Sequence, residues 1–209
     1  MEKILKGRIR PIVFDVGAQG GAYFEKALSV CPDAEIYAFE PNSRDFDLLS
    51  GMSVGRKVKL FKLALGEKDG HVELFCSEKG GLSSFHRRPL ESTGTVEDVE
   101  MVTLDKFCLG HSIKKIDLLK LDVEGHELSC LRGARQMLPA IENIQFEMSV
   151  ISRDARVYFK DIFEFLEGYK IFRILKDGLL EIKEPDRMSE LLFTTNYIAV
   201  RRDASLSVN

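Results

Sequence analysis

Short apolar runs alternate with longer amphipathic segments along most of the chain. Runs such as 12–16, 34–39 and 116–122 consist almost entirely of apolar residues, which is typical of strands buried on both faces. The segments 22–30 and 127–138 instead repeat apolar residues every three or four positions, which predicts helices with one buried face. Strands that alternate with helices predict an α/β fold, in which a mostly parallel sheet carries helices on both faces.

The rest of the chain continues this alternation without a linker or repeat that would divide it, so we expect a single domain over residues 1–209. A short lead, 1–10, precedes the first strand, and residues 203–209 are expected to form a frayed tail. After the third strand the pattern changes to two period-two runs, which predict half-exposed strands. The further elements expected are helices at 44–49, 105–110 and 157–166 and strands at 58–64, 71–75, 99–104, 143–148, 169–175 and 192–200.

The composition argues against several functional classes. A net charge of −3 and a pI near 5.9 give no electrostatic reason to expect binding to nucleic acid or to an anionic membrane. No segment approaches the ~20 apolar residues of a membrane-spanning helix, and the N-terminus lacks the apolar run of a signal peptide. The four cysteines lack C-x-x-C spacing, so we expect reduced thiols in a cytoplasmic protein.

Four predicted core strands end at or beside a carboxylate, and these acids are Asp15, Glu40, Asp122 and Glu147. Because ligands of parallel sheets bind beyond the carboxyl ends of the strands, all four side chains are expected at the binding edge. Asp and Glu are depleted in strands, so this recurrence is more specific than any one of the acids. The sequence therefore predicts a ligand site at this edge.

The glycine-rich turn after the first strand narrows the choice of ligand. Gly17 and Gly21 permit positive φ and a close approach of the ligand to main-chain N–H groups. The turn lacks the G-x-G-x-x-G of a dinucleotide site and the Gly-Lys-Ser/Thr of a phosphate loop. Glu40, 23 residues after Gly17, is placed to bind both ribose hydroxyls, whereas Asp15 would repel a pyrophosphate and suit a cation. S-adenosylmethionine, with a ribose, a sulfonium and no phosphate, meets both conditions.

Several motifs then occur in a fixed order: Asp15-Val16-Gly17-Ala18, Glu40-Pro41, Gly81-Leu82-Ser83-Ser84, Val102-Thr103-Leu104-Asp105 and Leu119-Lys120-Leu121-Asp122-Val123-Glu124-Gly125-His126-Glu127, with Gly133-Ala134 behind them. Over roughly residues 12 to 150 the chain thus resembles the FkbM family of methyltransferases, although Gln19 stands where the family commonly has Asn. The resemblance implies a three-layer, Rossmann-like class I methyltransferase fold with a mostly parallel, seven-stranded sheet and an antiparallel last strand. It also implies S-adenosylmethionine as cofactor, S-adenosylhomocysteine as product, and O-methylation of a hydroxyl on a sugar or a secondary metabolite.

The resemblance also implies roles for individual residues. Asp15 and Gly17 would face the methionine end of the cofactor, and Glu40 would hold the ribose. Ala64 and Leu65 would lie near the adenine, and the Ser83-Ser84 pair would close over the cofactor or the acceptor. The complete set of cofactor-binding residues expected is Asp15, Gly17, Ala18, Gly21, Glu40, Pro41, Ala64, Leu65, Ser83, Ser84 and Asp122.

Transfer to an alcohol calls for a general base within hydrogen-bond reach of the attacking hydroxyl. The catalytic candidates are Asp122 and Glu124, favoured by their place at the strand end, followed by His126, whose ordinary pKa lies near neutrality. Structural roles are the alternatives, since His126 could cap the next helix and Glu124 could be a charge favoured by the helix dipole. We expect no metal, because these three residues lack a recognisable ligand spacing.

Two other functions are compatible with this fold. A nucleoside- or NAD-dependent oxidoreductase would share Glu40 but would need the complete glycine pattern, and a non-catalytic module would bind S-adenosylmethionine without turnover. For the methyltransferase we expect a small-molecule or carbohydrate acceptor that offers a hydroxyl. Its pocket is expected to be built from the insertion at 67–100 and the loop at 149–156.

Overall fold

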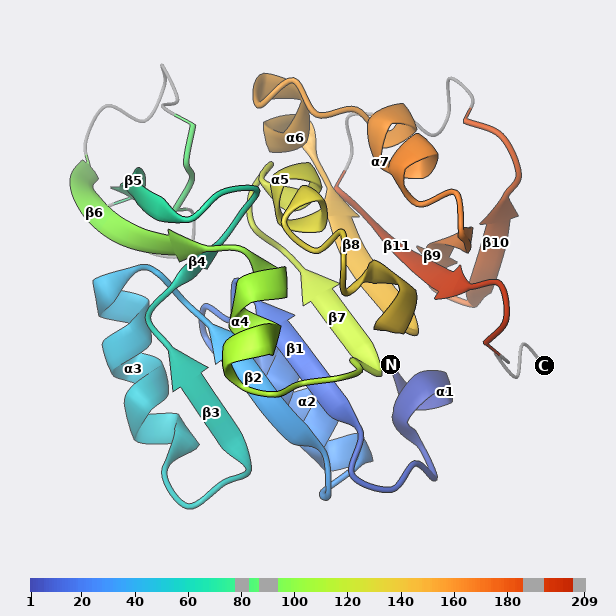
Figure 1. Cartoon of the computed structure of the whole chain (residues 1–209), viewed down its shortest axis with the longest axis horizontal. Helices are drawn as coiled ribbons and strands as arrows, with labels where there is room; N and C mark the ends of the chain where they lie inside the picture. The colour runs from blue at the N-terminus through green and yellow to red at the C-terminus, as the bar shows by residue number, and fades with distance from the viewer. Residues whose placement is uncertain (78–82, 87–93, 186–193, 205–209) are drawn as a thin grey trace.

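The structure, a computed structural model, describes residues 1–77, 83–86, 94–185 and 194–204. Gly81 and Leu82 of the loop predicted to close the site, and the end of the predicted tail, 205–209, lie outside the described residues. A large sheet forms the centre of the molecule, with helices on both faces and a second, smaller sheet beyond one of its edges (Figure 1).

The central sheet has the order β10-β9-β11-β8-β7-β1-β2-β3. The strands from β8 to β3 run parallel, whereas β11 is antiparallel to both of its neighbours, β8 and β9. This is the mostly parallel arrangement with an antiparallel last strand that the sequence predicts. The bounds are β1 (Ile12–Val16), β2 (Glu35–Phe39), β3 (Val58–Phe61), β7 (Leu118–Leu121), β8 (Asn143–Met148), β9 (Tyr169–Leu175), β10 (Gly178–Ile182) and β11 (Thr195–Arg201).

Strand β10 is an eighth strand, added to the seven that were expected. The chain reverses at Asp177, where a turn was predicted, and β10 then pairs antiparallel with β9. The adjacent leucines Leu179 and Leu180 break the alternation of apolar and polar residues on which a strand prediction depends. Backbone pairing with β9 therefore sets this strand, and the sequence pattern does not reveal it.

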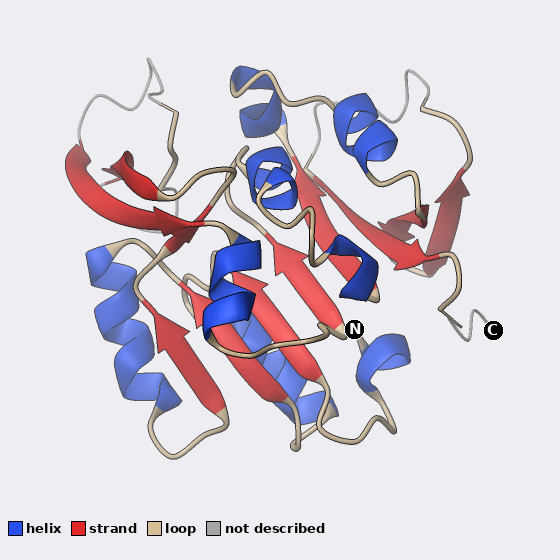
Figure 2. Ribbon diagram, in the orientation of Figure 1, coloured by secondary structure: helices blue, strands red, loops and turns tan. Residues whose placement is uncertain are grey.

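Helices cover both faces of the sheet (Figure 2). One face packs on α1 (Glu2–Leu5), α2 (Ala22–Val30) and α3 (Ser43–Ser53), and the other on α4 (Leu104–Gly110), α5 (Glu127–Arg132) and α7 (Phe159–Phe165). Two short segments, η1 (Leu138–Ala140) and α6 (Val150–Asp154), flank β8. Within the stretch predicted as a lead, Leu5 of α1 is fully buried. None of the described helices is long and apolar enough to cross a membrane.

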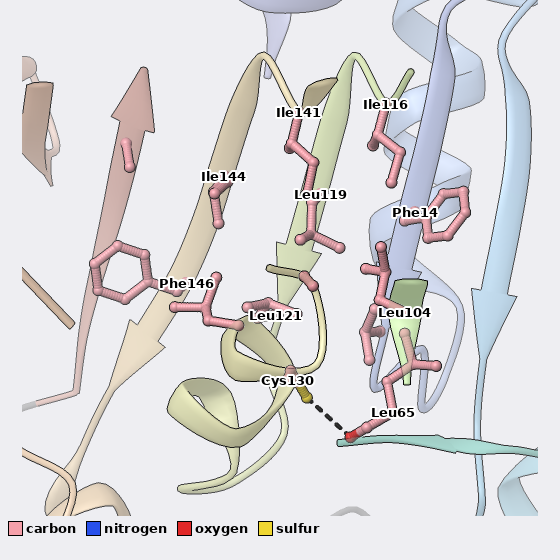
Figure 3. Packing of buried hydrophobic residues seen from close by; sticks show 14 of the residues in the cluster. Phe14, Leu65, Leu104, Ile116, Leu119, Leu121, Cys130, Ile141, Ile144 and Phe146 are labelled. Carbon is pink, nitrogen blue, oxygen red and sulfur yellow. Dashed lines mark hydrogen bonds between the residues drawn. The ribbon is translucent and has the colours of Figure 1, made fainter. Parts of the chain in front are cut away.

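The core lies in two layers because both faces of the sheet are covered. Val13 and Ile36 belong to the layer shared with α1 to α3, while Phe14, Leu119 and Ile144 belong to the opposite layer (Figure 3). All four cysteines are buried free thiols, as predicted, and one of them, in α5, donates a hydrogen bond to a carbonyl of the small sheet (Figure 3).

Helix α5 is shorter than the predicted helix over 127–138. The backbone N–H groups of Gln136 and Met137 donate to the carboxylate of Asp105, at 2.9 and 2.8 Å, and not to helical carbonyls. At Gly133, directly after the helix, the backbone approaches the carbonyl of Gly66 so closely that a Cβ would lie 1.9 Å from its oxygen. A tertiary contact thus ends the helix before its apolar pattern does.

The small sheet has the order β4-β6-β5 and is built from β4 (Ala64–Leu65), β5 (Gly70–Ser77) and β6 (Gly94–Val102). The strand predicted over 58–64 ends at Phe61, and Ala64 pairs with β6 instead of continuing in the central sheet. Figure 1 shows β5 and β6 beyond the carboxyl ends of β1 and β2. The insertion therefore covers the edge at which the sequence predicts the site.

Candidate functional site

A pocket lies where the carboxyl ends of β1, β2 and β7 meet the small sheet, and it encloses about 60 Å³. Residues from four of the predicted motifs converge on it, although they are far apart in the sequence. Its lining consists of Gly17, Gln19, Glu40, Pro41, Asp45, Leu74, Ser83, Phe85, Asp122, Val123 and Glu124. The structure therefore brings Gly17, Glu40, Pro41, Ser83 and Asp122 of the predicted cofactor set into one pocket.

The glycine turn shapes this pocket but uses several of its own donors internally. The N–H groups of Gly17 and Ala18 both donate to the carbonyl of Phe39, at 3.0 and 3.1 Å. Gly17 has φ +75°, and a Cβ there would lie 1.9 Å from the carbonyl oxygen of Asp122. Gly21, also at positive φ, begins α2 and does not line the pocket. The glycines permit close backbone packing here, and these two N–H groups are not directed at a ligand.

Glu40 is buried at the end of β2 and fixed by two backbone donors. Its Oε2 accepts from Gln19 N at 2.8 Å and its Oε1 from Asn42 N at 2.9 Å. Burial raises the pKa of Glu40 to about 7, against the opposing effect of these two hydrogen bonds. A carboxylate has about four acceptor positions, so it can still accept hydrogen bonds from a diol in the pocket.

Lys120 organises the base of the site, and we did not identify it from the sequence. Its Nζ donates to the carbonyl of Gly17 at 2.7 Å and lies 3.1 Å from Asp15 Oδ1 and 3.6 Å from Asp122 Oδ2. Burial opposes the charge on Lys120, but the two carboxylates outweigh it and raise its pKa. A signal was present, because a lysine within the apolar run 118–121 is buried only when it is paired.

Asp15 lies beneath the pocket and does not line it. Its side chain is completely buried, in β1, where its cationic neighbour is Lys120. Asp15 is the fourth of the five residues of β1, so its side chain projects from the face of the sheet toward α2 and not from the strand end. The structure thus gives Asp15 contact with the base of the site through Lys120.

The loop after β7 carries Asp122 and Glu124 into the pocket. Glu124 has φ +52° and Gly125 has φ +92°, so the loop turns sharply before α5. Glu127, completely buried, holds this loop, because its Oε1 accepts from Val123 N and Gly125 N at 3.2 and 3.3 Å. Burial raises the pKa of Glu127 to about 8. This positioning residue was not identified from the sequence either, since it was assigned only to the start of the helix.

His126, the third predicted base, does not line the pocket. It occupies the N-cap position of α5, but its side chain makes no capping hydrogen bond there. Its ring packs on Phe85, with centroids 4.7 Å apart, and its Nε2 is buried without a hydrogen-bond partner among the described residues. Burial, together with nearby His86, lowers the pKa of His126 to about 4, so the imidazole is neutral near pH 7. Of the three candidates, only Asp122 and Glu124 reach the pocket.

The serine pair connects the insertion to the pocket. Ser83 lines it and accepts from Asn42 Nδ2 at 3.1 Å, while buried Ser84 donates to the carbonyl of Glu124 at 3.3 Å. In contrast, Ala64 and Leu65 are buried in β4 and do not line the pocket, nor does Ala18. Among the described residues, no group of three or more His, Cys, Asp or Glu side chains could hold a metal ion.

Two curated proteins are similar to this chain in sequence. The 2-O-methyltransferase NoeI of Sinorhizobium fredii is 25% identical over 66% of this chain and 63% of its own length. The hexuronic acid methyltransferase AglP of Haloferax volcanii is 27% identical over 77% of this chain and 63% of its own length. The chain therefore spans less than two thirds of the length of either relative.

A structural comparison and a family comparison agree with these two sequence similarities. Aeropyrum pernix fibrillarin, solved with natively bound S-adenosyl-L-methionine, superposes with a TM-score of 0.52 over 94% of this chain and 68% of that one, at 15% identity. At this identity the likeness concerns the fold alone, and it supports the class I methyltransferase architecture. The Methyltransferase FkbM domain matches residues 15–171, from the end of β1 into β9, and the chain accordingly belongs to the FkbM methyltransferase family.

Proposed function

We propose that the protein is an S-adenosylmethionine-dependent methyltransferase that methylates a hydroxyl of a carbohydrate. The observation that carries this proposal is the pocket in which Glu40 and Asp122 both line one cavity at the carboxyl ends of parallel strands, in a chain of the FkbM methyltransferase family. The names of the two curated relatives support O-methylation and a sugar acid as acceptor, respectively.

The residues of the pocket fit the proposed cofactor. Glu40 accepts the ribose hydroxyls with the lone pairs that its two backbone donors leave free. Asp122, whose backbone packs closely on Gly17, is proposed to contact the methionine end of the cofactor. Lys120 contacts both residues, through the carbonyl of Gly17 and the carboxylate of Asp122. Ser83 and Phe85 of the insertion line the same pocket.

The chemistry required of the chain is to position an oxygen and accept a proton. When bound, the cofactor supplies an electrophilic methyl group whose carbon–sulfur bond breaks as the new carbon–oxygen bond forms, leaving a neutral thioether. Asp122 and Glu124 line the pocket and are the proposed proton acceptors. His126 is assigned a structural role, because it packs behind Phe85 with a pKa of about 4.

The proposal includes the setting of the enzyme. The four buried free thiols support a reducing, cytoplasmic environment, and the net charge of −3 favours a carbohydrate over nucleic acid as acceptor. One catalytic domain is proposed to extend over the chain, because the parallel core and its antiparallel strand form one continuous sheet.

Calorimetric titration with S-adenosylmethionine and S-adenosylhomocysteine tests the proposal. Wild type should bind both ligands, Glu40→Ala should weaken binding strongly, and the matched control Glu35→Ala, at the start of the same strand, should bind as wild type does. Transfer of a labelled methyl group to a panel of mono- and oligosaccharides then separates an enzyme from a binding module. Folded wild type that binds neither ligand would contradict the proposed function.

A further inference from the structure

A second cavity lies along the same edge of the sheet, beyond β8, and nothing in the proposed function uses it. This shallow, open groove has a volume of about 690 Å³ and lies where β9 ends and β11 begins. None of the described residues that line it is acidic. We propose that it is an acceptor subsite in which Arg173 and Lys176 bind the carboxylate of an acidic sugar unit; this inference rests on the proposed function and deepens it.

The strand register connects the groove to the cofactor pocket. Leu121 pairs with Phe146, which brings Asp122 beside Glu147, and Glu147 pairs in turn with Asn196 of β11. Strand β9, which carries Arg173, follows β11. Three strand spacings of ~4.8 Å separate β7 from β9, so the cations lie ~14 Å along the edge from Asp122. That distance exceeds one pyranose ring and points to an acceptor of two or more sugar units.

A set of hydrogen bonds links polar side chains of α2, β8 and β11, and two of these residues, Gln145 and Asn196, also line the groove. Tyr23 Oη donates to Gln145 Oε1 at 2.9 Å, and Gln145 Nε2 donates to Asn196 Oδ1 at 3.3 Å. Asn196 Nδ2 then donates to Glu147 Oε1, also at 3.3 Å. Polar side chains held in this way offer hydroxyl-binding groups in fixed positions, as recognition of a sugar chain requires.

The two cations of the groove are available to an anion. Arg173 donates from one Nη to Thr195 Oγ1 at 3.1 Å, which orients its guanidinium, and it forms no ion pair within the described parts of the chain. Lys176 is exposed and has no acidic partner in those same parts. A planar guanidinium with free donors matches a carboxylate in a two-point contact, and an ammonium adds charge beside it.

The distribution of charge also fixes the direction of the acceptor. Asp122 and Glu147 at the pocket end repel an anionic unit, whereas Arg173 and Lys176 at the groove end attract one. Burial, and after it the charge of nearby Asp122, raises the pKa of Glu147. An acceptor with one acidic unit therefore binds with that unit in the groove and a hydroxyl toward Asp122.

The test measures sugar binding directly, on the protein saturated with S-adenosylhomocysteine. Cellobiouronic acid, a disaccharide with one acidic unit, and its carboxyl-reduced, neutral counterpart cellobiose are titrated calorimetrically into wild type, Arg173→Gln, Lys176→Gln and the control Lys170→Gln, an exposed residue at the opposite end of β9. Wild type and the control should bind the acidic sugar at least tenfold more tightly than the neutral one. Each groove variant should lose most of that preference while its affinity for S-adenosylhomocysteine stays unchanged.

Every other outcome overturns the inference. Equal affinity for the two sugars, binding of neither, or a preference that survives both groove substitutions would each remove the subsite. Because Lys176 is exposed, its substitution leaves the fold intact even if Arg173→Gln does not. Failure to bind S-adenosylhomocysteine would instead contradict the proposed function, and labelled methyl transfer to neutral sugars alone would preserve that function without the acidic subsite.

Discussion

Binding of S-adenosylmethionine should weaken as the pH falls through the pKa of Glu40. Burial raises that pKa to about 7, so the free protein holds this carboxyl about half protonated near neutral pH. Ribose hydroxyls donate to the ionised form, and a protonated carboxyl offers fewer acceptor positions. The cofactor thus binds the ionised form and lowers the pKa of the group when it is bound.

The size of the effect follows from the position of this pKa. With a pKa of about 7, roughly one tenth of Glu40 is ionised at pH 6 and roughly nine tenths at pH 8. When the bound cofactor keeps the carboxyl ionised over this range, the apparent Kd rises about tenfold from pH 8 to pH 6, or roughly 1.4 kcal/mol. The apparent Kd rises as the pH falls, because protonation of Glu40 competes with binding of the cofactor.

Calorimetry at pH 6, 7 and 8 and constant ionic strength measures this dependence. Glu40→Gln should bind weakly with an almost flat profile, and any titration of the ligand itself is common to both proteins. Glu35→Gln, on the same strand, should retain the wild-type slope. Glu127, with a pKa of about 8, holds the neighbouring loop, so Glu127→Gln reports whether a second group contributes.

Two results would refute this reasoning. A flat wild-type profile would mean that Glu40 does not change its protonation when the cofactor binds, and the ribose assignment would fail. A tenfold slope that persists in Glu40→Gln would place the titrating group elsewhere in the pocket.

Three further substitutions test the packing beneath the site. Gly17→Ala adds a Cβ 1.9 Å from a backbone oxygen at φ +75° and should lower the free energy of unfolding in urea by more than ~2 kcal/mol, whereas Gly20→Ala, with open space around it, should change it little. Lys120→Met leaves the buried carboxylate of β1 without its cation and should cost about 3–5 kcal/mol in the same assay. The pKa of Glu127 is raised from 4.5 to about 8, so between these pH values the native state keeps a proton that the unfolded chain releases. The stability of wild type should therefore fall as the pH rises from 4.5 to 8, and thermal melts of Glu127→Gln should show a smaller fall.

The sequence predicted the sheet well because its parallel strands are buried on both faces and therefore consist of unbroken apolar runs. The strand-end rule likewise brought Glu40 and Asp122 to one pocket. Prediction was poorer where long-range backbone contacts decide the structure. Ala64 leaves the central sheet to pair with β6, and α5 ends early because Asp105 binds the next backbone N–H groups. No local pattern contains that information.

Within the site, the sequence identified the residues that line the pocket more readily than those that hold it. The role of Asp15 at the methionine end of the cofactor stays a prediction; its side chain, one residue before the end of β1, is buried and does not line the pocket. Lys120 was overlooked as a positioning residue although its place in an apolar run was a signal, whereas Glu127 was overlooked because a glutamate at a helix start is ordinary in isolation. The role of Lys120 depends on burial beside Asp15, which is distant in the sequence, and the role of Glu127 depends on burial beside the backbone N–H groups of the loop before it.

Residues around this pocket depart from the usual preferences for backbone conformation and for burial of charge. Gln19 and Glu124, both in its lining, have φ of +46° and +52°, a region that costs a side-chain-bearing residue on the order of 1–3 kcal/mol. Beneath them the charged Lys120 replaces an apolar residue in the centre of the sheet. Stability alone favours neither feature, because a buried ion pair is often no better than an apolar replacement of the same volume. Two strained residues and a buried lysine thus meet at one edge of the sheet, at the candidate site on which residues of the FkbM motifs converge.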